Sequence, residues 1–278
     1  MTAVGDTNLQ VTFHGVRGST PCHGPDTQRY GGNTSCVSVT APMTVPIVLD
    51  LGTGLRYFGE QYVGRPFKGA ALLTHLHWDH VQGVPFFQPL LEKGNEIDIY
   101  APVQEDGKSV KEAFDSIICP PQFPVDLNLF SGTFRFHDTV DSEFAIGDVR
   151  VTARSIPHIG PTLGYRLECN GSSIAYISDH QQPYDGSISV PDTVRELADG
   201  VDLLIHDSQY TPEEFEKKFY FGHCTTEFAV AVGLECGAKR LALFHHDPVR
   251  TDAELDTECR VVDGMQVFAA REGLTVSL

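Results

Sequence analysis

The chain has 278 residues, with 37 acidic against 20 basic side chains and a formal net charge of −17. Its 41% hydrophobic and 21% charged residues are typical of a folded globular protein and exclude a disordered or collagen-like chain. The acidic charge argues against a long nucleic acid as partner, because binding many phosphates depends on Lys and Arg. A small anion at a locally positive site is compatible with this charge.

The sequence shows no signal for export or membrane insertion. Its start, MTAVGDTNLQ, has neither a basic nor an apolar signal region, and no apolar run approaches the roughly 18 residues of a membrane helix. Seven cysteines form an odd set without a CxxC pair, which predicts free thiols. We therefore expect a soluble cytoplasmic protein that contacts no membrane. The oligomeric state is left open, with a homo-oligomer as one alternative.

Short apolar runs bounded by Gly, Pro, Asn or Asp recur along the chain and predict β-strands. In chain order they are 11–13, 36–40, 47–49, 70–73, 97–100, 149–153, 163–167, 173–177, 203–205, 241–244 and 274–276. Apolar residues at three- and four-residue spacing predict helices over 109–117, 193–198, 225–236 and 252–271. This order of elements predicts mixed α/β layers.

No repeat or linker divides the chain, so we expect a single domain over residues 1–278. The stretch 85–141 is the least regular part. It is expected to be an insertion over a cleft, with a simple surface crossover as the alternative.

The strongest functional signal is ALLTHLHWDHVQG at residues 71–83, where an apolar strand runs into three histidines and an aspartate. In extended chain His75, His77 and Asp79 point to one side, and His80 follows as the next helix begins. Imidazole and carboxylate suit divalent ions such as zinc, and so dense a cluster can serve two ions. The alternative is a solvated turn with Asp79 as helix cap, which a single histidine would favour.

This HxHxDH motif at a strand-to-helix turn resembles the signature of the metallo-β-lactamase superfamily. The likeness extends to polar residues at the ends of other expected strands, in IVLDLGTGLR, RSIPHIGPTLGYRL, IAYISDH and LALFHHDP. It implies an α/β fold, the four-layer αββα sandwich, with a dinuclear metal site at one edge of the two sheets. The two divalent ions are expected to be zinc, with manganese or iron as alternatives.

The resemblance also assigns the ligands. One ion would be held by His75, His77 and His158, the other by Asp79, His80 and His245, with Asp179 as the bridge. Asp50 would support the first cluster by hydrogen bonds to ligands or to loop backbone. His246 directly follows His245, so either is a candidate ligand, and the place immediately after the strand favours His245. His180, beside Asp179, is expected to support the site or to face the substrate.

Two further segments, DLLIHDSQYT at 202–211 and GHCTTEFAVAVGLECGAKRLALFHHDPVR at 222–250, are similar to motifs of the ribonuclease Z-like phosphodiesterase branch. In that branch an acidic residue orients a histidine that faces the scissile phosphate. The matching residues here are Asp207, in place of the usual Glu, and His223. A histidine held by a carboxylate can protonate an alkoxide leaving group. The alternative for His223 is a helix-start residue beside a capping Thr225 or Thr226.

The Gly-rich segment FHGVRGSTPCHGPDTQRYGGNTSC at 13–36 resembles the opening of cyclic-nucleotide phosphodiesterase-like members of the superfamily. Its Arg17 or Asn33 could contact a phosphate or a loop of the metal site. Two turns pinned by a structural salt bridge are the alternative.

Together these resemblances imply a metal-dependent hydrolase of a small phosphodiester, with a cyclic nucleotide as the first expectation. A hydroxide bound by the two metals would attack phosphorus, and the catalytic residues would be Asp79, Asp207 and His223. One alternative is a ribonuclease Z-like RNA-processing enzyme, which the acidic charge disfavours. Another is a lactone-type hydrolase, and outside enzymes the alternative is a metal-bound binding or sensing protein.

Overall fold

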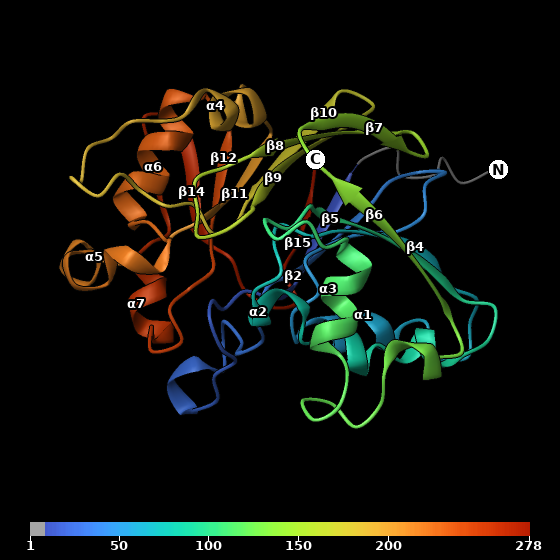
Figure 1. Cartoon of the computed structure of the whole chain (residues 1–278). Helices are drawn as coiled ribbons and strands as arrows, with labels where there is room; N and C mark the ends of the chain where they lie inside the picture. Colours follow the sequence, from blue (N-terminus) through green and yellow to red (C-terminus); the bar gives the residue numbers. More distant parts are fainter. Residues whose placement is uncertain (1–8) are drawn as a thin grey trace.

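The computed structural model describes residues 9–278. Two β-sheets pack face to face, and helices cover the outer face of each sheet (Figure 1). The sheets have the strand orders β15-β1-β2-β3-β4-β5-β6 and β13-β14-β12-β11-β10-β9-β8-β7. The predicted four-layer αββα sandwich is therefore confirmed.

The first sheet comes mainly from the first half of the chain. Its strands are β1 (Gln10–Gly15), β2 (Cys36–Thr40), β3 (Ile47–Leu49), β4 (Lys68–Leu72), β5 (Glu96–Pro102), β6 (Thr133–Thr139) and β15 (Thr275–Ser277). The strands of the second sheet are β7 (Ser142–Ile146), β8 (Val149–Ser155), β9 (Leu163–Cys169), β10 (Ser172–Ile177), β11 (Leu203–Asp207), β12 (Arg240–Phe244), β13 (Arg260–Val262) and β14 (Met265–Ala269). Each sheet has one parallel part, β3 to β6 in the first and β10, β11, β12 and β14 in the second.

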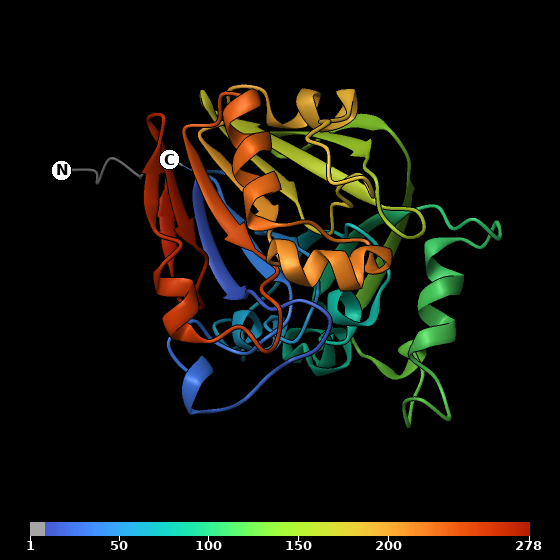
Figure 2. The ribbon, with the colours of Figure 1, turned by 90° about the vertical axis from the view of Figure 1, so that its left-hand side faces the viewer.

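Seven α-helices complete the described chain. They are α1 (Leu55–Glu60), α2 (Trp78–Val81), α3 (Val110–Ile117), α4 (Asp192–Ala198), α5 (Pro212–Lys218), α6 (Thr226–Glu235) and α7 (Asp252–Asp256). Figures 1 and 2 show α4 and α6 on the outer face of the second sheet, and α1 and α3 on the side of the first. Capping boxes begin α3, α5 and α7, where Ser109, Thr211 and Thr251 each pair with a Glu three residues later.

Three apolar clusters separate the four layers. In β4, Ala70 and Leu72 face the core between the sheets, whereas Ala71 and Leu73, which directly follows the strand, pack with the helices of the first sheet. This alternation follows from the two-residue period of a strand. A third cluster, which includes Phe228 of α6, lies between the second sheet and its helices. Both faces are thus buried in the central strands of each sheet, which explains the continuous apolar runs in the sequence.

The helix predicted over 252–271 is wrong beyond α7. Asp256 ends the helix, and the chain forms the hairpin of β13 and β14. Asp263 and Gly264 turn this hairpin with positive φ of 47° and 90°, the Asp-Gly combination of a tight two-residue turn. The apolar residues that matched a helical period therefore alternate between the two faces of a strand instead. β6, β7, α1 and α5 were also not predicted.

The stretch 85–141, expected as an insertion, supplies β5, α3 and β6. Residues 85–95 and 103–132 lie outside the strands of the first sheet, and Figure 2 shows the green segment with α3 at one side of the molecule. A cleft-covering role stays a prediction for that part. β5 and β6 are integral to the sheet because their paired residues continue its parallel register.

Between residues 9 and 278 no helix combines the length and the apolar character needed to cross a membrane. Residues 1–8, on which the expectation about export partly depends, lie outside the described residues. The cytoplasmic location therefore stays a prediction. All seven cysteines have free thiols, as predicted.

Candidate metal centre

Strand ends of both sheets bring the expected ligands to one edge of the sandwich. β4 runs through Thr74 into His75, β10 is followed by Ser178 and Asp179, and β12 is followed directly by His245. Carboxyl ends of parallel strands share an edge of a sheet, so residues far apart in sequence meet there. Asp79 lies in the first turn of α2, and not in extended chain as expected.

The backbone turns sharply at three of these positions. Asp50, Asp179 and His245 have positive φ of 56°, 60° and 59°. Asp and His are among the few side chains that enter this left-handed region with any frequency. Such residues cluster at functional sites, where surrounding contacts hold them in place.

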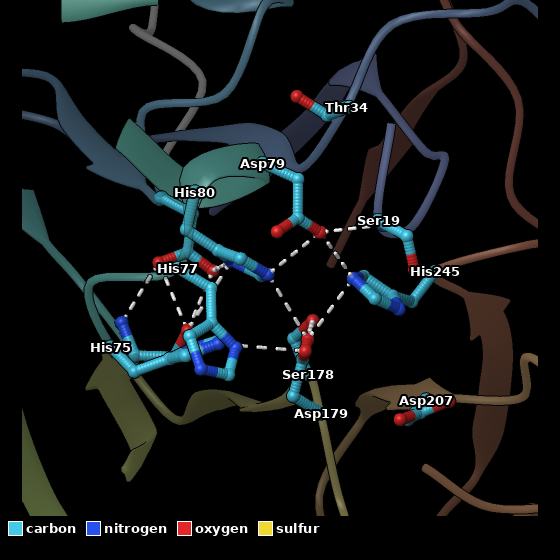
Figure 3. Close-up of polar contacts among 12 residues, drawn as sticks. Ser19, Thr34, His75, His77, Asp79, His80, Ser178, Asp179, Asp207 and His245 are labelled. Atoms are coloured by element: carbon cyan, nitrogen blue, oxygen red, sulfur yellow. Dashed lines mark hydrogen bonds and ion pairs between the residues drawn. The ribbon is translucent and has the colours of Figure 1, made fainter. Parts of the chain in front are cut away.

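The seven expected ligands form two groups that share Asp179. The first group is His75, His77, His158 and Asp179, and the second is Asp79, His80, Asp179 and His245. Within each group the ligand atoms lie within 4.8 Å of one another. Figure 3 shows Asp179 between the groups, with His75 and His77 on one side and His245 on the other.

The two oxygens of Asp179 face different groups. Oδ2 lies 3.6 Å from Nε2 of His75 and 3.7 Å from Nε2 of His158. Oδ1 lies 3.2 Å from Nε2 of both His80 and His245. This is the arrangement of a carboxylate that can bridge two ions.

The orientation of four histidines fits metal ligation. In each, a neighbouring oxygen contacts Nδ1 and Nε2 faces the centre. The pairs are His75 with Thr74 (3.0 Å), His80 with Asp50 (2.8 Å), His158 with the carbonyl of Gly222 (2.7 Å) and His245 with Gln209 (2.9 Å). Metal-binding histidines typically donate their second nitrogen in this way. Nε2 of His75 and Nε2 of His80 are buried without any hydrogen-bond partner, so these atoms lack the partner that an ion would supply.

The spacing of the ligand atoms also fits small divalent ions. Around a tetrahedral ion with bonds of about 2.0–2.1 Å, ligand atoms lie about 3.3 Å apart. Asp79 Oδ2 is 3.3 Å from His80 Nε2 and 3.0 Å from His245 Nε2. In the first group, His158 Nε2 is 3.3 Å from His77 Nδ1. The donor set of imidazole and carboxylate suits zinc and related ions.

Charge is distributed unevenly between the groups. Burial lowers the pKa of His75 well below its ordinary value and that of His158 to about 4. Burial has the same effect on His245, but Asp179 and Asp79 outweigh it and raise its pKa to about 8. Burial would raise the pKa of Asp79, yet His80 and His245 hold it well below its usual range. The carboxylates of the second group therefore favour positive charge, which a divalent ion provides.

Asp50 supports both ligand groups through hydrogen bonds. Its carboxylate accepts hydrogen bonds from the backbone N–H of Thr74 (2.8 Å) and from the hydroxyl of Tyr176 (2.8 Å), besides its contact with His80. Thr74 in turn contacts His75 of the first group. Asp50 thus touches the second group directly and the first through Thr74.

Arg17 and Asn33 hold loops together and lie outside the cavity. The guanidinium of Arg17 is fully buried and donates to the carbonyls of Gly31 (2.8 Å) and Arg250 (2.7 Å). Asn33 donates to the carboxylate of Glu272, 3.1 Å away. Arg17 thus makes the expected contact with a loop of the metal site, the loop after His245, whereas neither residue lines the cavity in which a phosphate would bind.

His246 and His180 belong to neither group. Nε2 of His246 contacts the carbonyl of Ala270 at 2.9 Å, so the geometry favours His245 as the late ligand. Nδ1 of His180 is 2.9 Å from Nε2 of His206 in a buried pair behind the site.

His223 and Asp207 form the expected pair. Nδ1 of His223 is 2.9 Å from Oδ2 of Asp207, so the shorter aspartate reaches the ring. Asp207, His223 and His245 also form a third group of possible ligand atoms. A cavity of about 450 Å³ adjoins the metal groups, and its wall includes His77, Asp79, Asp179, His223, Trp78 and Phe221.

Several supporting residues escaped sequence reasoning. The backbone N–H of Ser19 donates to Asp79 Oδ2 at 2.7 Å, visible in Figure 3, and Gln209 orients His245. A Cβ on Gly18 would lie 2.4 Å from the His245 ring, and one on Gly222 would lie 2.4 Å from His158. The glycines were visible in the sequence, but their partners come from distant segments.

Comparisons with known proteins place the chain in a family. A model of the beta-lactamase superfamily domain matches residues 65–246. Ribonuclease Z of Natronomonas pharaonis is 24% identical, with 98% of each chain covered. A diphosphatase from the PhnP family has a similar structure, with a TM-score of 0.72, 18% identity, and coverage of 98% of this chain and 97% of that one. Human short-form tRNase Z has a TM-score of 0.68 and 20% identity, covering 96% and 98%.

The matched region spans more than half of the chain and contains HxHxDH and His245. The chain therefore belongs to the metallo-β-lactamase superfamily, and among its relatives it is similar to ribonuclease Z.

Proposed function

We propose that the protein is a metal-dependent phosphodiesterase that hydrolyses a small phosphodiester. The observation that supports this most is the placement of Asp179, whose two oxygens face two ligand groups beside His223. Two ions, expected as zinc, would be held by the ligand groups described above. When bound, they supply positive charge to the phosphoryl oxygens and bring the pKa of a water ligand toward ~7.

The chain's own residues orient the reaction. Asp207 holds the His223 ring through Nδ1, which leaves Nε2 available to pass a proton to the leaving oxygen. The backbone N–H of Ser19 donates to Oδ2 of Asp79 and holds that carboxylate in place. Neither role requires movement of a strand.

The proposed substrate is a diester, with a cyclic nucleotide as the first expectation. No Lys or Arg is among the described residues that line the cavity. A phosphomonoester dianion would bring additional negative charge to a protein of net charge −17 without a basic side chain to meet it. A diester carries a single negative charge, which the ions alone can offset.

RNA processing is the second candidate, and the ribonuclease Z relatives favour it. Long RNA binds through many phosphate contacts, so its affinity draws on basic surface. The acidic charge and the cavity without basic residues favour the small substrate.

A turnover comparison on the zinc-loaded protein tests the proposal. Bis(4-nitrophenyl) phosphate should be hydrolysed much faster than 4-nitrophenyl phosphate, and 3′,5′-cyclic AMP should be cleaved to a monophosphate. Equal rates on the two aryl esters would contradict a diester site. Activity confined to precursor tRNA or to a lactone would replace the proposal with one of the alternatives, and metal binding without any turnover would favour the sensing protein.

A further inference from the structure

Two large aromatic side chains stand exposed at the wall of the metal cavity. Trp78 is 58% exposed and Phe221 is 53% exposed, and both line the cavity together with His77, Asp79, Asp179 and His223. Single exposed rings are common on protein surfaces, but two of them at one cavity form an apolar patch of the kind that marks ligand-binding grooves. A planar ligand would cover both rings on binding.

Both rings are adjacent in the sequence to residues of the metal site, which places them close to the two ligand groups. Trp78 lies between His77 and Asp79 in the first turn of α2. Phe221 precedes Gly222, whose carbonyl contacts Nδ1 of His158 at 2.7 Å. One ring therefore belongs to a segment that contributes to both groups, and the other to a segment that orients the first group.

The cavity offers two kinds of contact. Ions held by the ligand groups would bind a phosphate, and the exposed rings of Trp78 and Phe221 can contact a flat ring. The cavity has no described Lys or Arg that would bind a second phosphate. Lys218, which comes from the neighbouring helix α5, is paired with Asp247 at 2.9 Å. Selectivity among anions therefore depends on the apolar part of the ligand, and nucleobases stack well on aromatic side chains.

We infer that Trp78 and Phe221 recognise a nucleobase, so that the substrate class is a nucleoside phosphodiester with a single phosphate group. This inference deepens the proposed function and rests on it for the reaction. Recognition of the base can be measured without turnover, which separates the two.

The first experiment uses intrinsic fluorescence, because Trp78 is the single tryptophan of the sequence. The zinc-loaded protein is titrated with AMP and with ribose 5-phosphate, which has the phosphate and the sugar but no base. We expect saturable quenching of Trp78 emission by AMP and none by ribose 5-phosphate over the same concentrations. An equal response to both compounds, or no saturable response to AMP, would overturn the inference.

The second experiment measures kcat/KM for thymidine 5′-(4-nitrophenyl) phosphate and for methyl 4-nitrophenyl phosphate, which release the same phenolate. Trp78→Ala and Phe221→Ala should each lower the value for the nucleoside ester by about 5- to 100-fold, the scale of losing one stacked base. The methyl ester should change less than about twofold on the same argument. Trp78→Phe, which keeps a ring, should recover most of the loss.

Phe86→Ala is the matched control, because Phe86 is 56% exposed and lines only the neighbouring apolar hollow next to Trp78. It should leave both esters unchanged. A loss with Phe86→Ala as large as with Trp78→Ala, or an equal loss on both esters, would overturn the inference. If the wild-type protein hydrolyses neither ester, the proposed function fails, and the AMP titration still decides whether a base is recognised.

Discussion

The Asp50 carboxylate and the His80 imidazole form a fully buried pair, with Oδ2 of Asp50 2.8 Å from Nδ1 of His80. Asp50 follows β3, and His80 lies in α2, which follows the neighbouring strand β4. The contact therefore joins the chain segments that follow two adjacent strands of the first sheet. Thr74 and Tyr176 also donate to the same carboxylate. Asp50 is thus a purely accepting group surrounded by donors.

Asp50→Asn should weaken metal binding at the second group by about 10- to 100-fold, the usual effect of losing an outer partner of a metal-binding histidine. The amide nitrogen of the new Asn is itself a donor and would lie next to the donors that now contact the carboxylate. His80 would lose the acceptor that orients its ring. Competition with a chromogenic chelator measures the affinity. Tyr176→Phe is the control, since it removes one donor and keeps the carboxylate, and it should have a smaller effect. Wild-type affinity in Asp50→Asn would contradict the supporting role.

Metal stoichiometry tests the shared ligand. We expect about two divalent ions per wild-type chain, because the ligands present exceed the four of one tetrahedral site. Asp179→Ala should lower occupancy of both sites together, whereas His75→Ala should mainly empty one. Elemental analysis of purified protein gives the counts. His246→Gln should keep both ions, and loss of an ion there would show that His246, and not His245, is the late ligand.

His223→Ala should keep the metals and lose rate. General acid catalysis contributes about 10²–10⁴-fold, and the loss should be largest for alkoxide leaving groups and small for nitrophenolate, which leaves without a proton. Asp207→Asn should show a milder form of the same pattern, because Asp207 only orients the ring. Rates on cyclic AMP and on an aryl diester provide the comparison. If His223→Ala removes an ion, the group of Asp207, His223 and His245 holds metal instead.

Gly222→Ala should disturb the first metal group. The added Cβ would lie 2.4 Å from Nδ1 of His158, whose contact with the Gly222 carbonyl orients the ring. Gly160→Ala is a matched control, since Gly160 also has positive φ, 81°, but open space around the new Cβ. Both variants should lose about 1 kcal/mol of stability from backbone strain. Only Gly222→Ala should lose metal occupancy, and equal metal content in both would refute the steric argument.

His14 predicts a pH-dependent loss of stability away from the metal groups. Burial lowers the pKa of His14 in the folded chain from 6.5 to about 4. As the pH falls, the unfolded chain therefore takes up this proton first, and the free energy of unfolding decreases from about pH 6.5 down to about pH 4. The decrease between pH 7 and pH 5 is about 2 kcal/mol.

Urea unfolding at the two pH values measures this effect in wild type and in His14→Gln, which has no proton to gain. Between pH 7 and pH 5, wild type should lose about 2 kcal/mol more of its free energy of unfolding than His14→Gln does. His23→Gln, at an exposed histidine, serves as the control for the loss of a histidine side chain. An identical pH dependence of wild type and His14→Gln would contradict the role of His14.

The sequence predicted the parts of the fold that local pattern determines. Strands such as β4 and β12 were visible because buried parallel strands are continuous apolar runs. The hairpin of β13 and β14 was missed because its apolar residues also match a helical period, and the Asp263-Gly264 turn was overlooked. β6 was missed because its half-exposed residues, as in TFRFHDT, show no apolar run.

The candidate ligands were predictable because HxHxDH is dense and the other ligands follow strands in a fixed order. The contacts that orient them were not. Ser19 and Asp79 are 60 residues apart, and Gln209 and His245 are 36 apart. Each pairing arises only when distant strands of one sheet come together, and no local pattern marks it. Arg17 is a conspicuous charge in a Gly-rich segment, and of its two expected contacts the one with a loop of the metal site fits, since it binds the Arg250 carbonyl in the loop after His245.

β15 has a consequence for synthesis of the chain on the ribosome. It pairs antiparallel with β1, joining Gln10 to Ser277 and Thr12 to Thr275. Until residues 275–277 leave the exit tunnel, the nascent chain exposes the hydrogen-bonding edge of β1, and such an edge is a template for pairing with another chain. Contacts of this sequence separation also form slowly. The first sheet, although most of its strands are translated early, is therefore completed only after the second, and the edge of β1 is the part of the nascent protein that most needs protection by a chaperone.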